Sequence, residues 1–147
     1  MKIQNNITDK IIIIENKKAK FNFTIKKSLE AGIVLQGWEV KSIKKKNCSI
    51  INSYISFNNK YAYINNFIVS PIISISTHIV PNKETKKILL IHKKEKLNFR
   101  ILIKKEKYTI IPLKIYIKNN IIKVEIAIAK GKKYIDKKQY LKEKQIK

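Results

Sequence analysis

Hydrophobic and polar residues alternate around a central segment, Leu29–Ile43, which we take as the organising part of the chain. From Gly37 onward the alternation has period two, which is typical of a β-strand with one buried face. We therefore predict a strand over Ile33–Lys44, with a bulge or sharp bend at Gly37. The preceding residues, Lys26–Ala31, predict a short helical turn that ends at Gly32, because glycine tolerates the left-handed conformation common at helix C-termini.

Two further pairs of alternating segments are separated by short turns rich in asparagine, a pattern typical of β-hairpins. The first hairpin pairs Ser53–Phe57 with Tyr61–Asn65. The second pairs Tyr108–Ile117 with Ile121–Ala129, whose isoleucine and valine residues occupy every second position. We predict that this regular face of the last strand packs into the core.

The remaining segments give weaker patterns. Phe21–Ile25 alternates and predicts a strand, and Phe67–Val80 is interpreted as an extended segment bent at Pro71. Lys83–Lys107 lacks glycine and proline and spaces its apolar residues as a helix does, so we expect one broken helix or two short helices. Residues 1–15 form either a flexible N-terminal arm or an added edge strand.

Short strands with turn signals and a helical insert indicate a mainly β protein with accessory helices. We predict a small closed barrel of the oligonucleotide-binding type over residues 16–129. Periodicity alone also permits an open α+β sheet. Residues 130–147 are strongly basic with few apolar anchors, so we expect a tail that is disordered when free.

Charge points to a polyanionic partner. The 147 residues include 33 Lys and Arg against 10 Asp and Glu, which gives a formal net charge of +23. Such a surface attracts nucleic acid, and it attracts anionic phospholipid by the same physics. We favour nucleic acid. Lys17, Lys18, Lys41 and Lys123 are candidate phosphate contacts, with an ordinary solvated surface as the alternative for each single lysine.

The sequence gives little support for catalysis. Cys48 is the single cysteine, and together with His78 and His92 it makes no zinc-binding spacing. Neither histidine has an acid–base partner at a recognisable spacing. We expect no enzymatic activity, no metal, no cofactor and no small-molecule substrate. The longest mainly apolar stretch, Phe67–Val80, is shorter than the ~20 residues of a membrane helix, so we expect a soluble, cytoplasmic monomer.

Short motifs along the chain carry a more specific signal. They are Asn16–Ala19, Glu30–Gly32, Gln36–Ser42, Ser53-Tyr54, Ser76–His78, Lys86–Leu90, Pro112-Leu113, Lys130–Lys133 and Asp136-Lys137. In this order and spacing they resemble the SmpB family, the SsrA-binding proteins that partner transfer-messenger RNA in bacterial ribosome rescue. The resemblance runs from about Asn16 to Lys138.

The resemblance implies an oligonucleotide-binding-type barrel whose face binds the tRNA-like part of transfer-messenger RNA. It also implies a basic tail that reaches the decoding centre and the vacant mRNA channel of a stalled ribosome, so the ribosomal RNA there is a second expected partner. No membrane association is implied. The family usually has an aromatic residue or histidine where this chain has Ile135, and we expect Tyr134 or an apolar contact to compensate.

The candidate site residues fall into two groups. Those expected on the RNA-binding face are Asn16, Lys17, Lys18, Glu30, Lys41, Lys87 and Lys123. Those expected in the ribosome-binding tail are Lys130, Gly131, Lys132, Lys133, Tyr134, Ile135, Asp136, Lys137 and Lys138. Glu30 stands out because a carboxylate accepts hydrogen bonds from base or ribose donors but repels phosphate.

Three rival functions remain open at this level. A general ribosomal or single-strand RNA-binding barrel would show no preference for tRNA-like structure. An RNA-cleaving enzyme would depend on His78 or His92. A membrane-peripheral protein would depend on anionic lipid.

Overall fold

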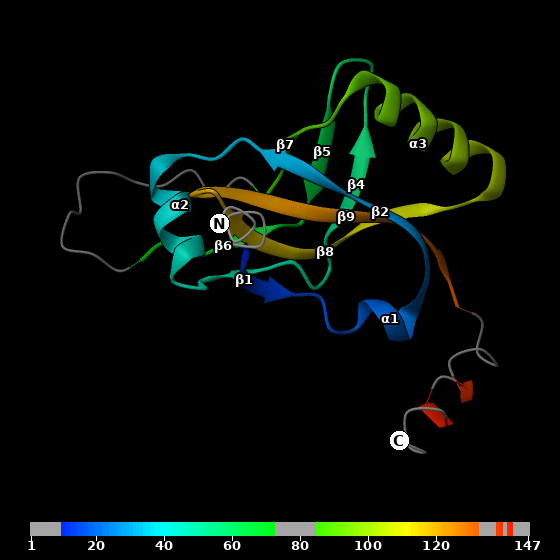
Figure 1. Ribbon diagram of the computed structural model, residues 1–147, viewed down its shortest axis with the longest axis horizontal. Helices are drawn as coiled ribbons and strands as arrows, with labels where there is room; N and C mark the ends of the chain where they lie inside the picture. Colours follow the sequence, from blue (N-terminus) through cyan, green and yellow to red (C-terminus); the bar gives the residue numbers. More distant parts are fainter. Residues whose placement is uncertain (1–9, 73–84, 133–137, 140, 143–147) are drawn as a thin grey trace, which may run out of the picture.

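The computed structural model of the protein describes residues 10–72, 85–132, 138–139 and 141–142 (Figure 1). The strands are β1 (Lys10–Glu15), β2 (Phe23–Ile33), β3 (Cys48–Ser49), β4 (Tyr54–Phe57), β5 (Ala62–Asn65), β6 (Ile68–Val69), β7 (Lys87–Leu90), β8 (Thr109–Lys118) and β9 (Ile121–Gly131). The helices are α1 (Ala19–Asn22), α2 (Gly37–Lys44) and α3 (Lys93–Glu106). The prediction of a mainly β protein with accessory helices is confirmed.

A curled antiparallel sheet forms the body of the molecule. Its seven strands follow the order β1-β8-β9-β2-β7-β5-β4, and β3 and β6 form a separate pair. The long strands β8, β9 and β2 run side by side through the middle, with α1 and α2 near their opposite ends (Figure 1). The sheet curls far enough for β4 to contact β8. Within the described ranges no hydrogen-bonded pairing joins β1 to β4, so a closed barrel is not observed.

Both predicted hairpins are confirmed. β4 pairs with β5, and β8 pairs with β9 along nearly their whole length. The second turn holds Asn119 and Asn120 at φ 53° and 65°, and this left-handed pair suits the twist between antiparallel strands. Asparagine tolerates that conformation better than most residues, which explains why the turn lies where the sequence predicts it.

In the central segment the prediction was a helical turn followed by a strand, whereas the structure has a strand followed by a helix. Lys26–Ala31 belongs to β2 instead of a helical turn, and Gly32 lies inside the strand, opposite Leu90, without a positive φ. The predicted strand over Ile33–Lys44 is wrong because α2 begins at Gly37, which starts a helix instead of a bulge.

A capping box explains this reversal. The Gln36 backbone N–H donates to Glu39 Oε1 at 2.8 Å, and the Gln36 side chain caps the first turn in return. The helix then buries Glu39, Ser42 and Ile43, which are spaced three and four residues apart from Glu39 as on one face of a helix. In so short a segment the same residues also fit an alternating, strand-like pattern.

Other predicted elements need smaller corrections. Phe21 and Asn22 end α1, and the strand begins only at Phe23. The first part of the predicted helix Lys83–Lys107 is β7, whose alternating burial marks it as a strand, and only the second part is α3. In Phe67–Val80 the structure contains β6, and the residues from 73 onward lie outside the described ranges.

For residues 1–15 we predicted either a flexible arm or an edge strand, and the structure describes the part from Lys10 onward. Lys10–Glu15 forms β1 on the edge of the sheet, paired with β8, so these residues are not a flexible arm. The last strand also continues to Gly131, two residues beyond its predicted end at Ala129, so Lys130 and Gly131 belong to β9.

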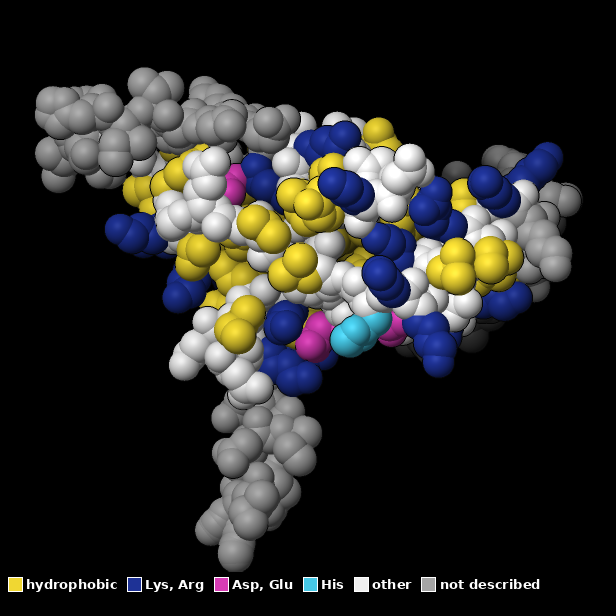
Figure 2. All heavy atoms as spheres, turned by 90° about the horizontal axis from the view of Figure 1, so that it is seen from above, with side chains coloured by type: hydrophobic (Ala, Val, Ile, Leu, Met, Phe, Trp, Pro, Cys, Tyr) yellow, Lys and Arg dark blue, Asp and Glu magenta, His cyan; other side chains and the backbone are white. Residues whose placement is uncertain are grey.

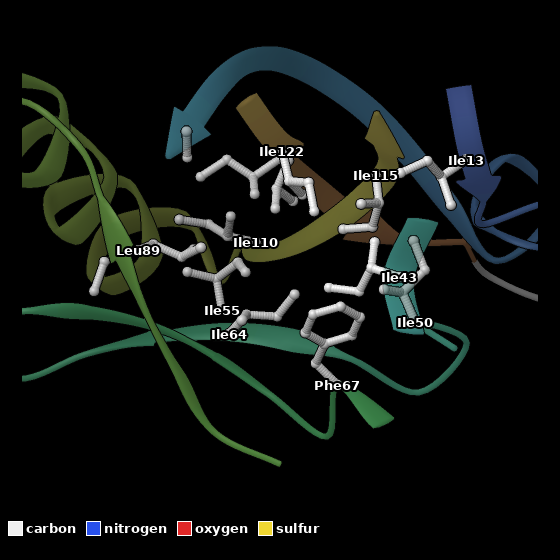
Figure 3. Packing of buried hydrophobic residues seen from close by; sticks show 14 of the residues in the cluster. Ile13, Ile43, Ile50, Ile55, Ile64, Phe67, Leu89, Ile110, Ile115 and Ile122 are labelled. Carbon is white, nitrogen blue, oxygen red and sulfur yellow. The ribbon is translucent and has the colours of Figure 1, made fainter. Parts of the chain in front are cut away.

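The core lies on the concave side of the sheet and consists mainly of isoleucine. Side chains from β1, α2, β4, β5, β7, β8 and β9 point toward one another, with Phe67 at one edge of the cluster beside Ile43 and Ile50 (Figure 3). Strand β9 contributes Ile122, Val124, Ile126 and Ile128, the face predicted from its alternation. On the opposite face of the same strand, Ala129 packs into a second, smaller cluster with Ala19 and Ile111, whereas Lys123 and Glu125 are partly exposed to solvent.

A buried ion pair fastens α2 to the sheet. Glu39 of α2 is 1% exposed, and its carboxylate contacts the ammonium group of Lys87 on β7, which is 6% exposed. Lys87 was predicted to bind RNA. Its burial against Glu39 contradicts that prediction, because an ammonium group enclosed in this way cannot reach a phosphate.

We expect Lys87→Met to lower the free energy of unfolding by about 3–5 kcal/mol, since it leaves the Glu39 carboxylate buried without its partner. The double variant Glu39→Leu/Lys87→Met should recover most of that loss, apart from about 1 kcal/mol for the missing helix cap. Urea unfolding measures both. Lys44→Met, a surface change in the same helix, serves as a control at about 0.5 kcal/mol or less. Equal stability of Lys87→Met and the unmodified protein would contradict the role of the pair.

Candidate nucleic-acid interface

The outward face of β8, β9 and β2 carries alternating charged side chains. On β9, Lys123 and Glu125 alternate with core residues. Lys123 pairs with Tyr116 of β8, and Glu125 pairs with both Lys114 of β8 and Glu30 of β2. The Lys114 ammonium lies 3.4 Å from the Glu125 carboxylate. The register of three strands thus gathers these residues on one surface.

Glu30 is the best-defined acceptor on this surface. The Tyr116 hydroxyl donates to Glu30 Oε1 at 2.6 Å, and Lys118 Nζ lies 3.4 Å from the same oxygen. The hydrogen bond from Tyr116, followed by the charges of Lys118 and Lys123, holds the pKa of Glu30 below its usual value despite partial burial. Burial and the nearby Glu30 carboxylate raise the pKa of Tyr116. Glu30 is therefore a fixed, ionised acceptor among lysines.

A groove of about 410 Å³ runs beside Glu30; we call it the Glu30 groove. It lies between the strands β2, β7 and β9 on one side and the β4–β5 turn and the start of α3 on the other. Its polar and apolar side chains include Glu30, Lys123, Leu90, Lys60, Tyr61, His92, Glu95 and Lys96. Leu90 is 60% exposed, although the alternation of β7 places its neighbour Leu89 in the core. The groove thus combines an apolar surface with cations and one positioned acceptor.

A second groove, of about 480 Å³, lies where the tail leaves the body; we call it the tail-root groove. Asn16 lines it, and its side-chain amide donates to the Pro112 carbonyl at 3.2 Å. Lys132 closes the other side: its backbone N–H donates to the Asn22 carbonyl at 2.9 Å, and its ammonium donates to the Lys20 carbonyl at 2.6 Å. Helix α1 therefore anchors the start of the tail.

The two grooves are separated along the sheet. Phe23, in the tail-root groove, and Glu30 are seven residues apart on β2, roughly 23 Å at about 3.3 Å per residue. The predicted RNA-face residues therefore divide between two ends of the strands and do not form one cluster. Glu30 and Lys123 meet at one end, while Asn16 and the exposed Lys17 and Lys18 lie near the other.

Other predicted site residues are placed as follows. Lys41 is exposed on α2, Lys130 and Gly131 end β9, and the Lys130 ammonium lies 5.2 Å from the centre of the Tyr108 ring. Lys138 is exposed. The tail candidates at 133–137 lie outside the described ranges. The space-filling view shows lysines distributed over most of one face, with acidic side chains only at isolated points (Figure 2).

Sequence reasoning did not select Leu90, Lys60, Tyr61, His92 or Lys96 as site residues, although all of them line the Glu30 groove. They come from three separate segments, so no local spacing reveals them. The one available signal was the alternation of β7, which directs Leu90 outward from a strand that was predicted to be helical.

Cys48, the candidate for a reactive thiol, is partly buried. Burial raises the pKa of the Cys48 thiol to about 11, so it stays protonated and poorly nucleophilic at neutral pH. In the part of the chain that the structure describes, no group of three or more His, Cys, Asp or Glu residues is arranged to hold a metal ion. No helix within those ranges has the length and apolar character required to span a membrane.

A lysine-rich surface over a curled β-sheet is typical of the nucleic-acid-binding class of proteins. A family model described as SmpB protein matches residues 13–147. The chain belongs to the SmpB family.

Individual relatives agree with this assignment. The chain is 44% identical over 133 residues to an SsrA-binding protein of Malacoplasma penetrans, covering 90% of each chain. It is 44% identical over 140 residues to an SsrA-binding protein of Borreliella burgdorferi, covering 92% of this chain and 90% of the relative. A solved structure described as "tmRNA-SmpB: a journey to the center of the bacterial ribosome" contains a chain that matches with a TM-score of 0.66 and 32% identity, over 82% of this chain and 85% of that one.

We expect Tyr116→Phe to raise the pKa of Glu30 toward its ordinary value, because the hydroxyl that chiefly stabilises the carboxylate is lost. Lys118→Ala should raise it less. Carboxyl carbon NMR titration measures both shifts. A lowered pKa in the folded state adds stability above the unfolded-state pKa, and that stability is lost as pH falls through the folded value. Tyr116→Phe should therefore weaken the acid dependence, and an unchanged Glu30 titration would contradict this account.

Proposed function

We propose that this chain is an RNA-binding adaptor of trans-translation. It binds the tRNA-like domain of transfer-messenger RNA, promotes delivery of that RNA to stalled ribosomes, and inserts its basic tail into the decoding centre and vacant mRNA channel. The observation that carries the proposal is the ionised Glu30, held by Tyr116 beside Lys123 in a groove on an otherwise basic surface. Family membership and the match to a tmRNA-bound SmpB support it.

The two grooves support a division of labour. The Glu30 groove offers an acceptor, cations and an apolar surface, which suits specific contact with a folded RNA. The tail begins at the other end of the same strands, where Lys132 is tied to α1. RNA bound at Glu30 would therefore leave the tail free to reach a different partner, the ribosomal RNA of the decoding centre. Positioning and charge complementarity perform this function, and no bond is made or broken by the protein.

The body acts as an oligonucleotide-binding-type barrel in this proposal. The curl that brings β4 against β8 supports it, although β1 and β4 remain unpaired edges in the described ranges. Residues 130–147 act as a separate functional segment, with Lys130–Lys133 and Asp136–Lys138 as its family motif and Tyr134 and Ile135 as its non-ionic contacts. A ribosome-bound role implies a cytoplasmic location.

We expect the body alone to recognise the tRNA-like domain. A chain truncated after Lys132 keeps β9 and the anchor on α1 intact. It should bind the tRNA-like domain in about 150 mM salt with excess bulk tRNA as tightly as the full chain, to within severalfold. Affinity of both should fall as salt rises, with a log–log slope of about 0.7–0.9 per phosphate neutralised. Filter binding or fluorescence anisotropy measures these values.

The same titration separates this proposal from its rival. Binding that disappears under tRNA competition would mean that net charge alone accounts for affinity, as expected for a general ribosomal or single-strand RNA-binding protein. Competitor-resistant binding by the full chain but not by the truncated chain would assign recognition to the tail and would contradict the division of labour. A slope near zero would contradict the electrostatic part.

Glu30→Gln tests the acceptor directly. It removes a negative charge from a basic protein, so simple electrostatics predicts tighter RNA binding. If Glu30 accepts from base or ribose donors, affinity for the tRNA-like domain should instead fall about five- to a hundredfold. Glu15→Gln on β1 removes the same charge from an exposed carboxylate outside the Glu30 groove and is the matched control. Similar behaviour of the two variants would contradict a specific role for Glu30.

A further inference from the structure

Tyr61 occupies the open side of the Glu30 groove, opposite the strands that carry Glu30 and Lys123. It is 44% exposed, and it lines both this groove and a smaller hollow at the tip of the β4–β5 hairpin. An exposed tyrosine ring facing a groove has an apolar surface with no protein group to cover it fully. It is therefore suited to contact a flat ligand.

The turn before Tyr61 is fixed by a single asparagine. The Asn58 side-chain oxygen accepts from the backbone N–H groups of Lys60 and Tyr61 at 2.8 and 2.7 Å. Its amide donates to the Tyr63 hydroxyl at 3.0 Å, and its backbone N–H donates to the Tyr61 carbonyl at 3.0 Å. Three of these hydrogen bonds hold the backbone that presents the Tyr61 ring, and the fourth joins the turn to the Tyr63 side chain, which lowers the entropy lost when a ligand binds.

Neighbouring elements hold the turn from outside. Lys96 of α3 donates to the Lys60 carbonyl at 2.6 Å, which ties the hairpin tip to the helix across the end of the groove. The Tyr61 and Tyr63 rings meet edge to face, with centres 6.2 Å apart and planes at 69°. This geometry supports the Tyr61 ring without stacking it on Tyr63. The Lys86 ammonium lies 4.3 Å from the Tyr63 ring centre, so the supporting ring itself lies beside a cation.

The groove has the charge and size for one nucleotide. Lys60, Lys96 and Lys123 supply positive charge around it, against the two carboxylates of Glu30 and Glu95, of which Glu30 is the one held by Tyr116. Its volume of about 410 Å³ falls within the range of roughly 300–1,000 Å³ usual for small-ligand sites. Proteins that bind single-stranded RNA combine these same components, an aromatic platform for the base and cations for the backbone.

We propose that Tyr61 stacks on one unpaired nucleobase of the bound RNA, which enters the Glu30 groove from the hairpin side. Lys60 and Lys96 neutralise the flanking phosphates, and Glu30 reads a donor on the base or ribose. This inference rests on the proposed function, since it names the feature of the RNA that the same site recognises: an unpaired loop nucleotide in place of a continuous helix.

The test uses the full chain and the tRNA-like domain of transfer-messenger RNA with loop nucleotides made abasic one at a time. Tyr61→Ala should weaken binding of the intact RNA about five- to fiftyfold, and Tyr61→Phe should bind within about twofold of the unmodified protein because the ring is retained. At one abasic position the difference between Tyr61→Ala and the unmodified protein should vanish. Leu97→Ala, 59% exposed on α3 but outside the groove, controls for loss of surface apolar area.

A second measurement, the fluorescence of 2-aminopurine, detects base stacking whether or not binding is specific for the tRNA-like domain. A short RNA hairpin with 2-aminopurine in its loop should lose fluorescence on binding the unmodified chain and Tyr61→Phe, but not on binding Tyr61→Ala. Unchanged affinity and unchanged quenching in Tyr61→Ala would overturn the proposal, and so would a loss of affinity that is equal at every abasic position. Quenching that depends on Tyr61 without resistance to tRNA competition would support stacking while contradicting the proposed function.

Discussion

The antiparallel ladder of β2, β9 and β8 is the constraint on which the rest of the structure depends. Because side chains alternate across a strand, β9 presents aliphatic residues to the core and Lys123 and Glu125 to solvent. A slip of one residue would bury both charges. The Asn119-Asn120 turn fixes this register, since its left-handed pair permits a tight connection at one position only. The same strand register therefore determines both which residues form the core and which charged residues lie on the outer surface.

Acidic residues are scarce in this chain, and the described ones near the sheet have distinct environments. Glu39 is buried against Lys87 and holds α2 on β7. Glu125 lies beside Lys114 on the outer face. Glu30 is bonded mainly by a neutral hydroxyl from Tyr116, with Lys118 farther away. The lysine contacts of Glu30 and Glu125 are equally long, at 3.4 Å, so the difference lies in the Tyr116 hydrogen bond that orients Glu30 and in its position on the Glu30 groove, which Glu125 does not line.

Sequence reasoning succeeded where one local signal determined the structure. The hairpins followed from asparagine turns between alternating segments, and the family resemblance followed from ordered motifs. It failed over Lys26–Lys44, where an eight-residue helix is too short to display its period and the Gln36–Glu39 cap decides the conformation. It also failed for Lys87, because a lysine in a basic chain gives no sign that a distant glutamate will bury it. The Glu30 groove lay beyond prediction, since its walls come from segments brought together only by the sheet.

The anchor at Lys132 explains how one small sheet can serve two RNA partners. The backbone and side chain of Lys132 both donate to carbonyls at α1, so the tail leaves the body at a fixed point. That point is separated from Glu30 by most of the length of β2, roughly 23 Å at about 3.3 Å per residue. This distance exceeds the screening length of about 8 Å at physiological salt. Phosphates bound at one end therefore contribute little to the potential at the other, and the two sites can bind different RNAs without competing for the same charge.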